Sequence, residues 1–261
     1  CGDRATMTSL TVLGSSGGTP TRTNPASGYL LETGDMSFWV DAGTGTFMEL
    51  AKHIDPGTLE GVVISHTHSD HCTDIFGLYG YLAFGPSGSV PVPVLVPPGA
   101  SEHLSAFARA AEEHVFHSVL DLVEVDAGST VKIDDDVSIR FGQAVHPVPA
   151  LVTRFDTPGG SVVYSGDTGP GSDLLDLAYG ADLLLCEATI AGERDERTYP
   201  YHLTAFEAGR IASEAGVQTL AVTHLASGVD PERALDEAGA GFGGELVIAM
   251  PGTKITIGET T

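Results

Sequence analysis

A cluster of histidines and acids limits most strongly how this chain can fold. The segment SHTHSDH (residues 65–71) directly follows the apolar run GVVI (residues 61–64). Such a run predicts a short buried strand, and a strand end is a rigid base from which the next loop can turn side chains inward. Because an unpaired buried histidine or carboxylate is costly, we interpret these side chains as sharing a bound group. The side chains concerned are His66, His68, Asp70 and His71.

Further candidate ligands follow other predicted strands. His146 comes after SIRFGQAV, Asp167 after SVVYSG and His224 after TLAVT. Imidazole and carboxylate ligands without thiolate suit Zn²⁺, Mn²⁺ or Fe²⁺. A catalytic zinc takes about three protein ligands, so this set can fill two sites if one aspartate is shared. The residues therefore predict two divalent metal ions, an arrangement that can activate water and clamp a phosphoryl group.

Short strand-like runs alternate with a few helical patterns along the chain. Expected strands lie at residues 10–15, 28–33, 37–43, 61–64, 94–96, 120–125, 137–142, 161–165, 183–186, 220–223 and 245–249. Expected helices lie at residues 101–114, 204–215 and 230–238. Sheets with helices on their outer faces are the natural architecture for this pattern. The pattern alone leaves open an α/β or an α+β fold with two sheets.

The chain has room for one large domain, and no low-complexity linker divides its 261 residues. We expect a single domain over residues 7–261, with residues 1–6 as a tag remnant or disordered N-terminus; a lipid-anchored Cys1 is the alternative. No run approaches the roughly 20 apolar residues of a membrane span. Three isolated cysteines form no disulfide framework, which predicts a cytoplasmic location. We interpret Cys72 as a small buried residue in preference to a ligand or nucleophile.

The charge of the chain bears on its partners. Asp and Glu number 35 against 12 Lys and Arg, a formal net charge of −23. Nucleic-acid binders usually carry a basic surface for phosphate contacts, and here the best basic cluster is only Arg194, Arg197 and Arg210. The charge therefore disfavours a long nucleic acid without excluding a local basic patch. An adaptation for solubility is the alternative reading of the same composition.

The ordered ligand set resembles the metallo-β-lactamase superfamily, whose HxHxDH signature matches SHTHSDH. The match continues in order through Asp41 in VDAG, His146, Asp167 in SGDT and His224 in THLASG. The resemblance covers nearly the whole chain. It implies an αββα sandwich of two mixed sheets flanked by helices, and a hydrolase with two metal ions at the sheet edge. Zinc is the first candidate for these ions, with manganese or iron as alternatives.

The resemblance also implies a role for each matching residue. His66, His68 and His146 would bind one metal, whereas Asp70, His71 and His224 would bind the other. Asp167 would bridge the two, and Asp41 would support the metal loop from behind the ligands. Two of these residues have alternative interpretations. Asp41 could be a turn residue in DAGTG, and His146 could be a loop histidine whose backbone is shaped by the neighbouring prolines.

The segment YHLTAFEAGRIASEAGVQTLAVTHLASG (residues 201–228) resembles the ribonuclease Z and related phosphodiesterase branch. In that branch His202 matches an extra histidine that binds no metal, and Glu187 matches its acidic partner. A histidine held by a carboxylate can stay protonated and assist a phosphoryl oxygen or a leaving group. His202 and Glu187 are therefore predicted catalytic residues, and the metal ligand Asp70 is predicted as a third. The alternatives are a surface histidine at a helix start and a solvated acid at a strand end.

Two departures from ribonuclease Z affect the substrate. The chain shows no basic Gly/Pro-rich arm, and HLASG lacks the usual aromatic–basic ending. We therefore predict a phosphodiesterase for a small phosphodiester such as a cyclic nucleotide; by resemblance a homodimer is compatible with this. The alternatives are an endoribonuclease that processes tRNA 3′ ends, a lactonase or other ester hydrolase, and a non-catalytic metal-binding module. The last would be expected to have a degraded ligand set.

The glycine-rich loop GSSGGTPTR (residues 14–22) lacks the GK[ST] ending of a phosphate-binding loop. We interpret it as a loop at the rim of the metal cleft. Ser15, Ser16 and Thr19 are candidate substrate contacts, as is Ser227 after the last ligand histidine.

Overall fold

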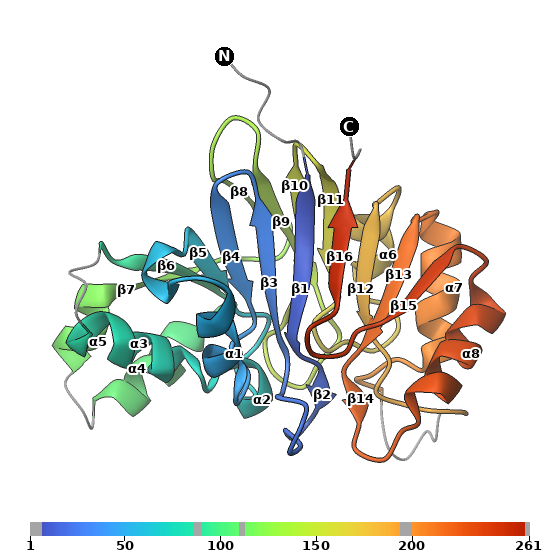
Figure 1. Ribbon diagram of the computed structural model, residues 1–261, viewed down its shortest axis with the longest axis horizontal. Coiled ribbons are helices and arrows are strands. Elements are labelled where there is room, and N and C mark those ends of the chain that lie inside the picture. The colour runs from blue at the N-terminus through green and yellow to red at the C-terminus, as the bar shows by residue number, and fades with distance from the viewer. Residues whose placement is uncertain (1–6, 86–89, 110–112, 194–199, 259–261) are drawn as a thin grey trace.

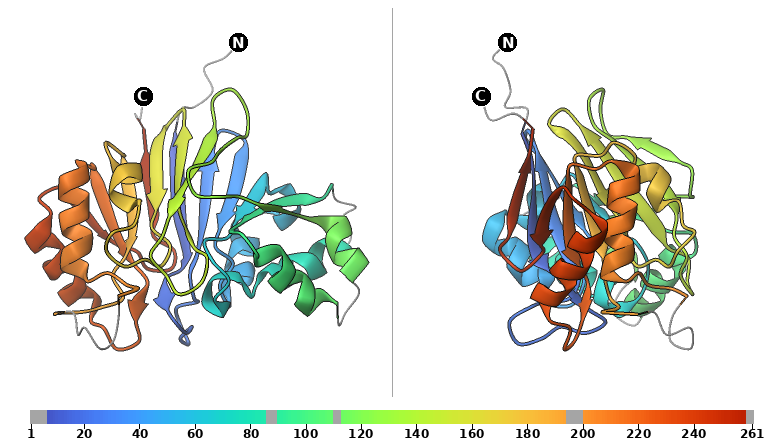
Figure 2. Two further views of the ribbon diagram at one scale, coloured as in Figure 1. Left: turned by 180° about the vertical axis from the view of Figure 1, so that it is seen from behind. Right: turned by 90° about the vertical axis from the view of Figure 1, so that its right-hand side faces the viewer.

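Two mixed sheets face each other, and helices cover their outer faces (Figures 1 and 2). The computed structural model describes residues 7–85, 90–109, 113–193 and 200–258. Each sheet has seven strands, and a third, two-stranded sheet joins β14 to β2. The expected αββα sandwich is therefore confirmed.

The first sheet has the order β16-β1-β3-β4-β5-β6-β7. It is antiparallel from β16 to β4 and parallel from β4 to β7. Its strands are β1 (Thr8–Gly14), β3 (Gly28–Thr33), β4 (Met36–Val40), β5 (Gly61–Val63), β6 (Val92–Val96), β7 (Leu120–Glu124) and β16 (Lys254–Ile257).

The second sheet has the order β15-β13-β12-β11-β10-β9-β8. It is parallel from β15 to β11 and antiparallel from β11 to β8. Its strands are β8 (Thr130–Lys132), β9 (Ser138–Gln143), β10 (Leu151–Thr157), β11 (Gly160–Tyr164), β12 (Leu183–Glu187), β13 (Thr219–Thr223) and β15 (Glu245–Ile248). The small sheet pairs β2 (Ser16–Gly17) with β14 (Leu225–Ala226).

The helices divide between the two outer faces. Those on the first sheet are α1 (Thr46–His53), α3 (Ile75–Phe84), α4 (Ala100–Ala108) and α5 (Glu113–Val119). Those on the second sheet are α6 (Leu174–Ala178), α7 (Ala205–Ala215) and α8 (Pro231–Gly241). A 3₁₀ turn, η1 (Pro56–Thr58), precedes β5, and the short helix α2 (Ser69–Cys72) carries part of the histidine cluster.

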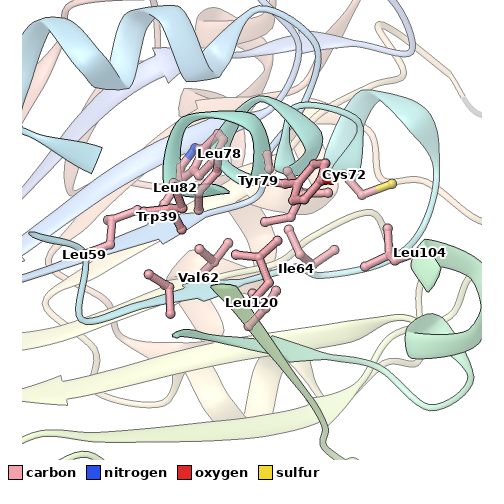
Figure 3. Close-up of a cluster of buried hydrophobic side chains, with 14 of the residues drawn as sticks. Trp39, Leu59, Val62, Ile64, Cys72, Leu78, Tyr79, Leu82, Leu104 and Leu120 are labelled. Carbon is pink, nitrogen blue, oxygen red and sulfur yellow. The ribbon is translucent and has the colours of Figure 1, made fainter. Parts of the chain in front are cut away.

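The alternation of side chains along each strand explains why central strands are apolar throughout. In β4, Phe38 and Val40 face the core between the sheets, whereas Trp39 faces the helices. Val62 and Ile64 join Trp39 beneath α3, as Figure 3 shows. Because both faces of these strands are covered, their sequences are continuous apolar runs without a polar face.

The structure corrects the predicted helix at residues 101–114. Two helices, α4 and α5, replace it, and residues 110–112 between them lie outside the described residues. Phe107 follows the buried Leu104 at helical spacing, which is typical of a core position, but it is 66% exposed and rests on Phe76 with ring centroids 4.2 Å apart. The helices at residues 204–215 and 230–238 are confirmed as α7 and α8, the second running on to Gly241.

The structure also tests the predictions about the cysteines and about membrane-spanning segments. Cys72 and Cys186 are buried, which confirms the interpretation of Cys72 as a core residue. Burial raises the pKa of the Cys72 thiol to about 12, so it is a poor nucleophile near neutral pH. Among the described residues, no helix is both long and apolar enough to cross a membrane.

The packing of α7 on α8 gives a test of the fold. A Cβ at Gly209 would lie 2.1 Å from the carbonyl oxygen of Ala238, a backbone atom that can yield only if the helices separate. We expect Gly209→Ala to lower the free energy of unfolding by about 1–3 kcal/mol, measured by urea denaturation. Gly80→Ala in α3 is the matched control, since no atom lies within 4 Å of its Cβ. It should stabilise by about 0.5–1 kcal/mol, and equal effects of the two changes would contradict the packing argument.

Candidate metal centre

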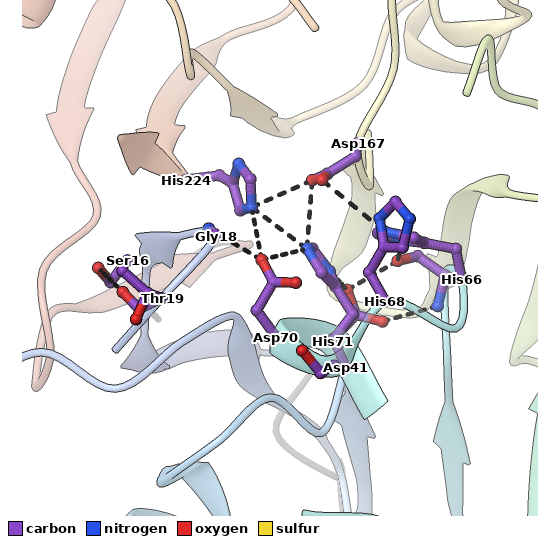
Figure 4. A network of polar contacts seen from close by, with 12 residues as sticks. Ser16, Gly18, Thr19, Asp41, His66, His68, Asp70, His71, Asp167 and His224 are labelled. Atoms are coloured by element: carbon purple, nitrogen blue, oxygen red, sulfur yellow. Dashed lines mark hydrogen bonds and ion pairs between the residues drawn. The ribbon is translucent and has the colours of Figure 1, made fainter. Parts of the chain in front are cut away.

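The predicted ligands meet at one edge of the sandwich, where the carboxyl ends of strands from both sheets lie together (Figure 4). Parallel strands end at the same edge, so residues far apart in sequence can converge there. Strands β4 and β5 lead to Asp41 and the histidine loop, and β11 and β13 lead to Asp167 and His224. The whole predicted ligand set is brought together there.

Three histidines form one group of ligand atoms. His68 Nδ1 lies 3.0 Å from His66 Nε2 and 3.0 Å from His146 Nε2. Asp167 Oδ2 lies 3.7 Å from His66 Nε2. These four residues converge closely enough to hold one metal ion.

The second group lies on the other side of Asp167. His71 Nε2 is 3.2 Å from His224 Nε2, and both nitrogens are 3.4 Å from Asp70 Oδ2. Asp167 Oδ1 lies 3.3 Å from His71 Nε2 and 3.4 Å from His224 Nε2. Asp167 therefore presents one carboxylate oxygen to each group, as a bridging ligand requires.

The donor set fits a cation. Asp167 Oδ1 is buried and accepts no hydrogen bond from the described residues, although it is surrounded by ring nitrogens. Such an unsatisfied buried oxygen is costly unless a bound group compensates it. A divalent ion would do so, because nitrogen and carboxylate ligands both suit Zn²⁺, Mn²⁺ and Fe²⁺.

The pKa shifts of His66, His146 and Asp167 agree with this fit, whereas His71 must release a proton before its Nε2 can bind a metal. Burial, aided by neighbouring His71, holds the pKa of His66 well below its usual value, and burial lowers the pKa of His146 to about 4. Burial would raise the pKa of Asp167, but the nearby His224 and His71 hold it well below the usual range. Burial would likewise lower the pKa of His71, yet Asp167 and Asp41 raise it well above its usual value. Neutral histidines and ionised aspartates are the forms that bind metals.

The Asp41 carboxylate supports the cluster from below. Its Oδ1 accepts from the Ser65 backbone N–H at 2.6 Å. Its Oδ2 accepts from the Ser65 hydroxyl at 2.8 Å, from His71 Nδ1 at 2.6 Å and from the Tyr164 hydroxyl at 2.7 Å. Since His71 donates through Nδ1, Nε2 is the nitrogen that faces the second ligand group.

Sequence reasoning missed Ser65, although it precedes His66 directly. The Ser65 hydroxyl donates to Asp41, so at 3.0 Å it can only accept from His66 Nδ1. That contact leaves the His66 Nε2 lone pair toward the first ligand group. Tyr164, which reaches Asp41 from the opposite sheet, had no local sequence signal.

His202 and Glu187 form a pair beside the metal ligands. His202 Nδ1 lies 3.0 Å from Glu187 Oε1 and 4.0 Å from Asp167 Oδ2, and its ring stacks on that of His224 at 5.8 Å. Burial would lower the pKa of His202, but the hydrogen bond and charge of Glu187 outweigh it and raise the pKa. Glu187 is fully buried, so it is not a solvated acid at a strand end.

The predicted substrate-contact residues lie near the metal ligands, but no hydrogen bond joins their side chains to them in the described structure. Ser16 Oγ donates to the Thr19 carbonyl at 2.7 Å, while the loop reaches the cluster through Gly18, whose N–H donates to Asp70 Oδ2 at 2.9 Å (Figure 4). Ser15, Ser16 and Ser227 line a hollow of about 200 Å³ whose lining includes none of the clustered ligands. Their role in substrate binding stays a prediction.

An αββα sandwich with histidines and aspartates gathered at the sheet edge defines the class of metallo-hydrolases with a metallo-β-lactamase fold. The chain belongs to the β-lactamase superfamily, because the family model described as "Beta-lactamase superfamily domain" matches residues 36–225. A protein of Mycobacterium leprae is 35% identical over 253 residues, covering 95% of this chain and 88% of that protein.

Two further proteins match nearly the whole chain. The probable metallo-hydrolase YhfI of Bacillus subtilis is 32% identical over 250 residues, covering 93% of this chain and 97% of that protein. A crystal structure of YhfI superimposes with a TM-score of 0.85 at 28% identity, covering 96% of this chain and 99% of the other. The human short-form tRNase Z shares the fold, with a TM-score of 0.75 at 22% identity over 95% of this chain and 99% of that one.

The ribonuclease Z of Halobacterium salinarum is 29% identical, covering 93% of this chain and 95% of that protein. The match runs over 296 positions, more than the 261 residues of this chain. The Halobacterium protein therefore carries insertions that this chain lacks. The alignment with YhfI, over 250 residues, contains no insertions of that length.

Replacing the Asp41 carboxylate tests its support of the centre. Asp41 has φ 56°, a conformation that asparagine also tolerates, so Asp41→Asn isolates the loss of a carboxylate oxygen. An amide N–H would then face buried donors, and we expect a loss of about 3–5 kcal/mol in the free energy of unfolding of the metal-free protein. Metal affinity should fall about 10–100-fold in a chelator competition. Asp135→Asn on the exposed surface is the control, and two variants with equal stability would contradict the role of Asp41.

Proposed function

We propose that this chain is a dinuclear metal-dependent phosphodiesterase that hydrolyses a small phosphodiester, such as a cyclic nucleotide. The observation that carries the proposal is the Glu187–His202 pair, which lies beside both ligand groups. The imidazole is 3.0 Å from Glu187 and 4.0 Å from the shared ligand Asp167. Hydrolysis of a lactone or a thioester has no evident need for this additional cationic group.

The chain's own residues would hold two cations. His66, His68 and His146 supply three nitrogens to the first, whereas Asp70, His71 and His224 supply one oxygen and two nitrogens to the second. Asp167 offers an oxygen to each. Zinc is the first candidate because it accepts this mixture of ligands with an open position, and manganese or iron remain alternatives.

Bound cations supply Lewis-acid charge and lower the pKa of water. The protein's part is then to position the substrate and manage its charge. His202, held by Glu187, can donate a hydrogen bond to a phosphoryl oxygen or a proton to the leaving oxygen. Because the pair is nearly enclosed, its charge is less screened than at the surface.

Two observations support a small substrate. The formal charge of −23 opposes the approach of a long polyanion. The chain also aligns with YhfI over nearly its full length, but with the Halobacterium ribonuclease Z only across insertions that it lacks, whereas a ribonuclease Z of Mycolicibacterium paratuberculosis, 30% identical, aligns over 240 residues. The second candidate, a ribonuclease Z-type endoribonuclease, is supported by the 29% identity to the Halobacterium protein.

A substrate panel tests the proposal. Purified protein loaded with zinc or manganese is assayed on 3′,5′-cyclic AMP, bis(p-nitrophenyl) phosphate, a lactone and a precursor tRNA. We expect turnover of the small phosphodiesters, lost in Asp167→Ala because both ligand groups lose their shared carboxylate. Cleavage of the tRNA alone would overturn the small-substrate assignment. Turnover of the lactone without phosphodiesterase activity would overturn both candidates.

Replacing His202 separates catalysis from metal binding. His202→Ala removes the cationic group but none of the proposed ligands, so we expect kcat to fall about 10²–10⁴-fold with both metals retained. Metal analysis of the purified variant checks the second part. His103→Ala, at an exposed position of α4, is the control and should leave activity unchanged. A His202→Ala variant that lost metal but kept its activity per bound metal would show that the assigned role is wrong.

A further inference from the structure

The Thr189 hydroxyl lies between Glu187 and the proposed metal ligand His224. Thr189 Oγ1 is 2.7 Å from Glu187 Oε2 and 2.8 Å from His224 Nδ1. It also lies 3.2 Å from His202 Nδ1 and 3.2 Å from the carbonyl oxygen of His224. One hydroxyl therefore touches both a metal-binding and a catalytic histidine, as well as the acid between them.

The direction of these hydrogen bonds follows from the atoms involved. A hydroxyl has one proton to donate and two lone pairs that accept. Glu187 already accepts from the Thr168 backbone N–H at 2.7 Å, as a carboxylate would. Its Oε2 and the His224 carbonyl compete for the Thr189 proton, and the shorter, charge-assisted bond to Glu187 is the stronger. The hydroxyl can then only accept from the His224 ring.

This direction fixes the tautomer of His224. With its proton on Nδ1, the ring turns the Nε2 lone pair to the place of the proposed cation, which Asp70, Asp167 and His71 surround in Figure 4. The opposite tautomer would aim an N–H at the place of the cation and leave Thr189 facing a lone pair. A ligand histidine is usually fixed in this way by the partner of its other nitrogen.

We propose that Thr189 is a positioning residue that relays the charge of Glu187 to His224, so that one carboxylate serves both the catalytic His202 and the second metal site. The inference rests on the proposed metal centre. Ser65 stands between Asp41 and His66 in the same manner, which gives the first ligand group an equivalent hydroxyl. The two hydroxyls thus act on opposite sides of the shared Asp167.

Removing the hydroxyl tests the relay. Thr189→Val keeps the shape of the side chain, and we expect the second metal to bind about 10–100-fold more weakly in a chelator competition, with the first metal little changed. Thr189→Ser returns the hydroxyl and should recover most of the affinity. Thr219→Val is the matched control, because its hydroxyl lies at the start of the same strand that leads to His224 and contacts only Glu245 in the described structure.

The metal-free protein provides a readout that does not depend on activity. Because Asp70 and Asp167 can hold a proton on His224 Nε2 when no metal is bound, the readout is Nδ1. Nitrogen NMR should show a proton on His224 Nδ1 in the wild type and in Thr189→Ser, and its partial loss in Thr189→Val. Unchanged protonation of Nδ1 and unchanged second-site affinity in Thr189→Val would overturn the relay. If the wild type bound no metal at all, the proposed function would fail, whereas the Nδ1 comparison would still decide the role of Thr189.

A double-mutant cycle tests whether Thr189 acts through Glu187. Glu187→Gln should weaken the second metal site by itself, since the amide no longer offers a carboxylate to the hydroxyl. If both residues act in one chain, the double variant loses no more affinity than the weaker-binding single variant. Additive losses would show that Thr189 acts independently of Glu187 and would overturn the coupling.

Discussion

The buried carboxylate of Asp41 is the constraint on which the rest of this site depends. It is inaccessible to solvent and accepts hydrogen bonds from the histidine loop of one sheet and from Tyr164 of the other. A charge in that position is tolerated only when every donor is in place. The donors must therefore stay where the fold puts them, which fixes the His71 ring and the distance between the two sheet edges. The left-handed backbone at Asp41 is part of this arrangement, because it turns the chain from β4 into the site.

The two halves of the sandwich use the same chemistry. In each half, parallel strands end in an acid, and that acid holds one histidine directly and a second through a hydroxyl. Asp41 uses Ser65 for the second contact, and Glu187 uses Thr189. The two halves are alike because both sheets place parallel strands side by side with their carboxyl ends at the shared edge. The halves differ in what the directly held histidine does, since only the first-half histidine lies among the proposed ligands.

The sequence pattern predicted strands better than helices, for a physical reason. Strands buried on both faces read as apolar runs, and β12 and β13 were found in this way. The helix α3 is apolar on nearly all sides, so it has no polar face from which helical periodicity could be recognised. The predicted helix at residues 101–114 is confirmed only over α4, because its spacing does not reveal where that helix ends. Phe107 has the right spacing for the core but lies at the exposed margin, which only the packing of α4 on its neighbours decides.

The sequence by itself determined which chemical groups are available and in what order, because metal affinity follows from residue type and the tight spacing of SHTHSDH leaves little alternative. The tertiary structure decided how those groups divide between two sites. Asp167 reaches both groups only because β11 ends at the same edge as β5. Thr189 and Glu187 lie two residues apart in the chain, but the contact of Thr189 with His224 spans 35 residues. Such contacts depend on sheet register, which no local pattern in one chain specifies.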